Sequence, residues 1–124
     1  MKGIACGVAT SAMAIANCAH AQQHEFKQLS GPQIRAELSG KYATDDTHWS
    51  HRYLPGGTLI HTERGKQAKG RWAVRGNQLC IADSEKAPAN ECFDVFKRNS
   101  DIEFRDKGIP FASGRIRSQI NRAD

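Results

Sequence analysis

No stretch of this 124-residue sequence is long and apolar enough to cross a lipid bilayer. The longest apolar run, residues 4–16, has about 13 residues, whereas a membrane-spanning helix needs about 20. Glycine, threonine and serine interrupt this run, and no second run approaches the length of a membrane span. The chain also lacks internal repeats and low-complexity tracts. We therefore expect neither a membrane anchor nor a repeat architecture.

The motifs of common catalytic centres are missing as well. There is no G-x-S-x-G nucleophile elbow, and the glycines of GGT and GRW mark turns rather than a phosphate-binding loop. The acidic residues Asp83, Glu85, Glu91 and Asp94 have no spacing that selects two of them for glycoside cleavage. We therefore expect no catalytic residue, no cofactor and no enzymatic activity.

The N-terminal residues have the three parts of a secretory signal peptide. Lys2 supplies the positive charge, residues 4–16 form the apolar region, and small residues alternate up to Ala21. We expect cleavage after Ala21, which leaves residues 22–124 as the mature chain. Lipidation of Cys18 is the alternative, but Asn17 occupies the position where a lipoprotein has a small residue.

Two cysteines, Cys80 and Cys92, remain after this cleavage. An even number of cysteines in an exported chain indicates a disulfide, and this one closes a loop of about 13 residues. Such a loop stabilises a domain by roughly 3 kcal/mol on the chain-entropy model. A redox pair usually has C-x-x-C spacing, and no residues with zinc-ligand spacing flank these cysteines. We therefore predict a structural disulfide.

Turn residues divide the chain after Gln28 into one short helix and a series of short strands. Ser30 suits a helix cap, Pro32 a first helical turn and Gly40 a stop. Beyond Gly40 apolar and polar residues alternate, as is typical of strands. The predicted elements are a helix at 31–38 and strands at 41–44, 48–54, 58–63, 70–75, 79–82, 91–97, 102–105 and 109–117.

Seven or eight short strands with turns every 8 to 12 residues predict a mainly β, antiparallel meander. A sheet that curls onto itself buries one face per strand and removes exposed edges. We expect residues 29–124 to form a small antiparallel up-and-down β-barrel with the helix at one end, after an N-terminal lead-in at 22–28. A β-sandwich is the alternative. Cys80 and Cys92 alternate with the apolar residues, which places their disulfide outside the barrel or at its rim.

The segments GRWAVRGNQLC, ECFDVF and IEFRD follow the helix segment LSGPQIRAELSGK and the aromatic strand WSHRYLPGGT. This series resembles a group of small exported proteins from alphaproteobacteria. The likeness covers most of residues 29–117 and consists of turn glycines, core aromatics and a cysteine pair. That group is uncharacterised or described as lipocalin-like. The resemblance therefore implies a β-barrel in the periplasm, and it carries over no catalytic residue.

One face of the strand at 48–54 carries Trp49, His51 and Tyr53 and is the strongest candidate for a binding site. If that face points inward, these side chains line a cavity with Trp72 and Phe104. His51 is then either a ligand contact or a hydrogen-bonded core histidine. We predict that this cavity holds a small apolar or amphipathic ligand.

The turn at residues 55–57 decides which residue lies opposite His51. A three-residue turn places His61 there, and Glu63 is then near enough to complete a metal site. A two-residue turn pairs His61 with Arg52 instead. We expect partly exposed strand histidines and no bound metal.

Basic residues outnumber acidic ones, 18 to 13. Lys69, Arg71 and Arg75 share one side of a strand, and Arg115 and Arg117 share one side of the last strand. They form either a solvated outer face or a surface that attracts anionic envelope partners. Nucleic acid is not an expected partner, because the chain is exported.

The sequence therefore favours a non-catalytic periplasmic binding protein that holds a small ligand. The alternative is a protein-binding module, such as an inhibitor of an envelope or secreted hydrolase. Such a module would act through residues 83–90 or through the lead-in. A structural envelope protein is a third interpretation.

Overall fold

The computed structural model describes residues 25–118. The elements are β1 (Lys27–Gln28), α3 (Gly31–Leu38), β2 (Lys41–Thr44), β3 (Trp49–Tyr53), β4 (Thr58–Glu63), β5 (Lys66–Arg75), β6 (Gln78–Ala82), β7 (Glu91–Arg98), β8 (Asp101–Asp106) and β9 (Ile109–Ser118). The predicted signal peptide, its cleavage site and residues 22–24 of the lead-in lie outside the described residues. Within residues 25–118, no helix has the length and apolar character needed to cross a membrane.

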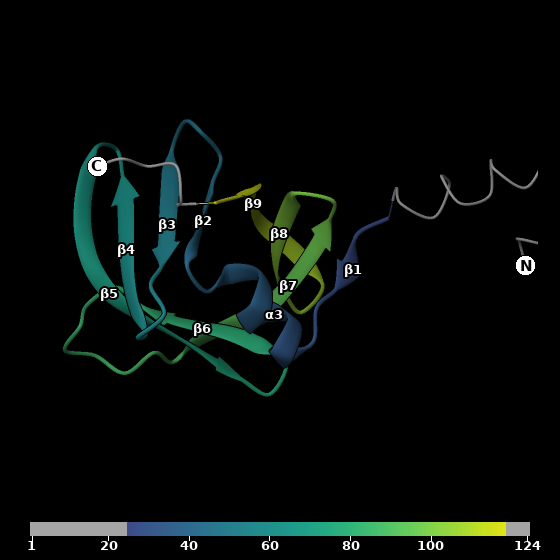
Figure 1. Cartoon of the computed structure of the whole chain (residues 1–124), viewed down its shortest axis with the longest axis horizontal. Helices are drawn as coiled ribbons and strands as arrows, with labels where there is room; N and C mark the ends of the chain where they lie inside the picture. The colour runs from purple at the N-terminus through teal and green to yellow at the C-terminus, as the bar shows by residue number, and fades with distance from the viewer. Residues whose placement is uncertain (1–24, 119–124) are drawn as a thin grey trace, which may run out of the picture.

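Strands β2 to β9 form a closed antiparallel barrel in which each strand pairs with the next along the chain (Figure 1). The first and last of these strands close the ring, with Ala43 of β2 opposite Ile116 of β9. Each of the eight strands thus has a neighbour on both sides, which removes exposed edges from the ring. The predicted up-and-down barrel with one short helix is confirmed, and the alternative sandwich is wrong.

The end of the predicted lead-in belongs to the sheet. β1 pairs with the second half of β7, where Lys27 lies opposite Lys97, beyond the part of β7 that pairs with β6. Leu29 continues this contact by donating its backbone N–H to the carbonyl oxygen of Val95 at 2.8 Å. β1 therefore pairs with the part of β7 that extends beyond β6, and this pairing positions the start of α3.

Helix α3 closes one end of the barrel, packed against β2, β5 and β6. Ser30 caps it, because the Gln33 N–H donates to Ser30 Oγ while the Gln33 side chain accepts from the Ser30 N–H. The Gly31 N–H donates to Oδ1 of Asn77 in the β5–β6 turn at 2.8 Å. A Cβ atom on Gly31 would overlap the carbonyl oxygen of Gly76, so only glycine permits this approach.

The helix end of the barrel is filled with apolar side chains. Inward residues alternate along each strand, so each strand buries one face. Helix α3 also buries one face, with Ile34 and Leu38 four residues apart. Seven of these side chains are at most 1% exposed: Ile34, Leu38, Tyr53, Leu59, Leu79, Val95 and Ile102. This core blocks the barrel between the helix end and the opposite end.

The predicted disulfide joins Cys80 to Cys92. The two residues lie directly opposite each other on β6 and β7, with their Cα atoms 4.0 Å apart. As the alternation predicts, the disulfide lies outside the barrel interior. It is nevertheless covered, because Cys80 belongs to a small second core with alanines: Ala73, Ala82, Ala87 and Ala89.

Residues 83–90, the loop between β6 and β7, supply that cover. Arg71 donates from Nε to the carbonyl oxygen of Glu85 at 2.6 Å, and Arg75 donates from Nη1 to that of Ala89 at 2.5 Å. Both arginines are exposed on the outer face of β5, where the sequence places them, and from there they anchor the loop against the outside of the barrel.

Candidate functional site

A cavity of about 870 Å³ opens at the end of the barrel opposite α3. Its lining includes His48 before β3, Arg64 in the β4–β5 turn and Asp83 after β6. In an up-and-down barrel alternate turns lie at the same end, and α3 meets the β5–β6 turn at the other end. The cavity is therefore a bowl whose floor rests on the buried core.

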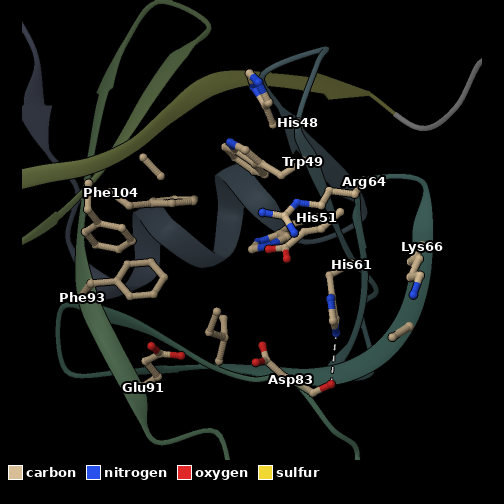
Figure 2. Close-up of a pocket in the computed structure, with 15 residues that line it drawn as sticks. His48, Trp49, His51, His61, Arg64, Lys66, Asp83, Glu91, Phe93 and Phe104 are labelled. Atoms are coloured by element: carbon tan, nitrogen blue, oxygen red, sulfur yellow. Dashed lines mark hydrogen bonds between the residues drawn. The ribbon is translucent and has the colours of Figure 1, made fainter.

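One wall of the cavity is aromatic. Phe93 of β7 lies 5.0 Å from Phe104 of β8 between ring centroids, and Phe111 of β9 lies 5.2 Å from Phe93. Trp49 of β3 lies 5.9 Å from Phe104. Figure 2 shows Phe93 and Phe104 on the side of the cavity opposite His61 and Lys66. Such a wall offers ring faces and edges to a flat apolar group.

A β-bulge directs Phe111 into this wall. Phe104 pairs with Ala112 while the next residue, Arg105, pairs with Pro110, so Phe111 is the extra residue on β9. Bulges redirect side chains and are common at barrel rims. Phe111 and Ala112 consequently both line the cavity although they are consecutive. Phe111 is 55% exposed, which places it at the mouth.

His51 lies on the floor of the cavity. Its Nδ1 atom is 3.3 Å from the hydroxyl group of Tyr53, and its ring meets Trp49 edge-on at 5.0 Å. Burial and, to a smaller extent, the neighbouring His61 lower the pKa of His51 to about 4, while Asp83 acts in the opposite sense. His51 is therefore neutral at physiological pH.

The turn at residues 55–57 has the three-residue form, so His61 lies directly opposite His51. His61 donates from Nε2 to the carbonyl oxygen of Asp83 at 3.0 Å, which holds it against β6 (Figure 2). Among residues 25–118, no three histidine, cysteine, aspartate or glutamate side chains are grouped so that they hold a metal ion. The arrangement supplies polar contacts instead.

The mouth of the cavity carries charged side chains of both signs. They are Glu63, Arg64, Lys66, Asp83 and Glu91, and all five residues are exposed. Within the described part of the chain, no ion pair joins any of them to another residue. The mouth is therefore hydrated and polar, whereas the aromatic wall below it is apolar.

Three of the five predicted ligand-binding residues line the cavity: Trp49, His51 and Phe104. Tyr53 and Trp72 share their inward face but do not belong to the lining. The ring of Trp72 lies 5.5 Å from that of Tyr53, and its Nε1 donates to the carbonyl oxygen of Leu54 at 2.8 Å. These two residues support the floor and do not reach the open space.

Sequence reasoning missed Phe93 and Phe111 as lining residues. Alternation along residues 91–97 predicts an inward Phe93, but nothing in the sequence gives its depth in the barrel. Phe111 breaks the alternation because of the bulge, so no periodic signal points to it.

The predicted basic surface is largely engaged within the protein. Arg115 pairs with Asp101 at 3.5 Å and Arg117 with Asp46 at 2.7 Å. The strands that carry the two predicted basic groups, β5 and β9, are separated by β2, β3 and β4. The basic residues therefore form no single site around the cavity.

No protein family, no curated protein and no solved structure matches the chain. The resemblance to small alphaproteobacterial proteins therefore stays a prediction.

Proposed function

We propose that this protein is an exported, non-catalytic binding protein that holds a small amphipathic ligand in the open end of its β-barrel. The cavity is the observation that supports this function. Its volume of about 870 Å³ is in the range of small-molecule sites, and its lining combines an aromatic wall with a few polar groups. The neutral imidazole of His51 and the rings around it offer contact area and one hydrogen bond.

The proposed compartment is the periplasm. The Cys80–Cys92 disulfide supports export, because disulfides persist in oxidising compartments and are rare in the cytosol. An extracytoplasmic binding protein of this size suits the capture of a small molecule from the envelope.

Native mass spectrometry of the protein purified from the periplasm tests the ligand-binding function. We expect an additional mass that disappears on denaturation. Ala68→Phe should remove it, because Ala68 lines the cavity and a phenyl ring there fills the open space. Gln67→Phe is the matched control, since Gln67 is exposed and is the neighbour of Ala68 on β5, with its side chain on the opposite face. An apo mass from several preparations, or equal loss in both variants, contradicts the proposal.

The protein-binding module is the second candidate, and the loop at residues 83–90 is the observation in its favour. Arg71 and Arg75 hold this loop in one conformation, as suits a preorganised recognition surface. A function carried by the loop would be lost on Lys86→Glu and retained on Ala68→Phe. The two substitutions therefore separate the candidates.

A further inference from the structure

The hydrogen bond beneath His51 determines which of its ring nitrogens carries the proton. The hydroxyl group of Tyr53 is fully buried, and among the described residues its partner is Nδ1 of His51. Burial raises the pKa of Tyr53 far above its usual value, so the hydroxyl keeps its proton. If Tyr53 accepted from Nδ1–H, its own proton would have no acceptor among the described residues, so we assign Tyr53 as the donor to Nδ1.

The other nitrogen of His51 must then carry the proton of the neutral ring. In the part of the chain that the structure describes, Nε2 of His51 has no hydrogen-bond partner, yet no buried side-chain nitrogen or oxygen lacks one. Nε2 is therefore an accessible atom, and His51 lines the cavity. His51 consequently presents an N–H donor from the floor to whatever the cavity holds.

The surroundings of this donor disfavour a charged group in the bound ligand. The rings of Trp49 and Tyr53 flank His51 at 5.0 and 6.0 Å. The cavity's charged side chains are the exposed ones at the mouth. A carboxylate beside His51 would lose its water and meet the negative charge of Asp83, which is costly, and an ammonium group could not accept a hydrogen bond from Nε2–H.

The shape of the cavity disfavours a long alkyl chain. The floor rests on Tyr53 and Leu59, which are at most 1% exposed, so no tunnel continues toward α3. Along the wall, Phe93, Phe104 and Phe111 lie within 6.4 Å of one another, with Phe111 exposed to the open space and the buried rings of Phe93 and Phe104 packed behind it. Offset and edge-on contacts favour a flat aromatic partner over a flexible chain.

We infer that the cavity selects a flat, uncharged aromatic compound whose buried end carries a hydrogen-bond acceptor, such as a carbonyl oxygen, for Nε2–H of His51. The inference rests on the proposed ligand-binding function and specifies its ligand class. Phe111, at the mouth, covers the outer part of the ring system.

Four probes test this inference by titration and fluorescence: 2-acetylnaphthalene, 2-ethylnaphthalene, 2-naphthoate and dodecanoate. One neutral hydrogen bond contributes roughly a factor of ten in affinity, so we expect the ketone to bind about tenfold more tightly than the hydrocarbon. Naphthoate and dodecanoate should bind more weakly than both. Equal affinity for ketone and hydrocarbon, or preference for either anion, overturns the inference and leaves the proposed function intact. Absence of binding by all four, with an apo mass in native spectra, defeats both.

Two substitutions test whether the preference for the ketone over the hydrocarbon arises at the floor of the cavity. His51→Leu should reduce the preference for the ketone to about one, because the donor is removed. Tyr53→Phe keeps the ring and lets the imidazole proton occupy either nitrogen, so it should reduce the same preference without abolishing binding. An unchanged preference in both variants contradicts the role of Nε2.

A third substitution tests the mouth. Phe111→Ala should weaken both naphthalene probes by about tenfold, because it removes the outermost ring contact. Ile109→Ala is the matched control, since Ile109 is 68% exposed on the same strand and does not line the cavity. Equal losses in the two variants contradict a specific role for Phe111.

Discussion

At the scale of single residues, His51 shows what a sequence pattern leaves open. Alternation predicts that Trp49, His51 and Tyr53 share one face of their strand, and in the structure that face points inward. The pattern could not decide whether His51 is a core histidine or a ligand contact. It has features of both, because Nδ1 is hydrogen-bonded below while Nε2 faces open space. Successive inward residues differ in depth by about 7 Å, and that depth depends on where the core ends.

The pKa of His51 makes stability depend on pH. It is about 4 in the folded protein, against 6.5 for an ordinary histidine. As pH falls from 6.5 to 4, the unfolded chain gains a proton that the folded protein does not, so the free energy of unfolding decreases. The gap between the two pKa values corresponds to roughly 3 kcal/mol, lost over this window. Urea unfolding at pH 7 and pH 4 measures it.

His51→Asn should remove the decrease in the free energy of unfolding that His51 causes between pH 6.5 and pH 4, because asparagine does not titrate. His48→Asn should retain it, since the His48 side chain is 80% exposed. A decrease of the same size in His51→Asn and the wild type would show that other groups cause it.

At the scale of elements, sequence reasoning succeeded where alternation is regular and failed where it is interrupted. The helix at 31–38 has the predicted bounds, because Ser30 and Pro32 mark its start. β5 begins at Lys66, four residues before the predicted strand, because Lys66, Gln67 and Lys69 give no apolar signal. Pairing with β4 extends the strand there, and such tertiary pairing is not encoded in local composition.

The anchored loop at residues 83–90 leads to a prediction for Arg75. Arg75→Met keeps the apolar stem but loses the hydrogen bond to the carbonyl oxygen of Ala89. We expect a loss of about 1–2 kcal/mol in the free energy of unfolding and faster tryptic cleavage after Lys86. Lys69→Met is the control, because Lys69 is exposed on the same face of β5. Unchanged cleavage after Lys86 would show that Arg75 does not restrain the loop.

At the scale of the whole molecule, the barrel could be predicted because strand number, turn spacing and chain length favour closure. The cavity could not, because its volume depends on how far α3 and the core side chains fill the interior. Tyr53 and Trp72 illustrate this limit, since they belong to the predicted inward set and lie below the open space.

The contact between α3 and the β5–β6 turn tests how the helix end is closed. Gly31→Ala places a methyl group against the carbonyl oxygen of Gly76, so we expect a loss of about 1–3 kcal/mol in the free energy of unfolding. Gly56→Ala is the control, because a Cβ atom there meets nothing within 4 Å. Chemical unfolding of both variants measures the difference. Equal stability would mean that the helix shifts freely on the barrel.

Closure by α3 at one end also determines how a bound molecule is exchanged. In the part of the chain that the structure describes, buried side chains close the cavity on the side of α3, so a bound molecule has to leave through the mouth before another can enter. Its departure rate should therefore be independent of how much competitor surrounds the protein. A cavity closed at one end can store a compound and release it, but it cannot act as a channel through the barrel.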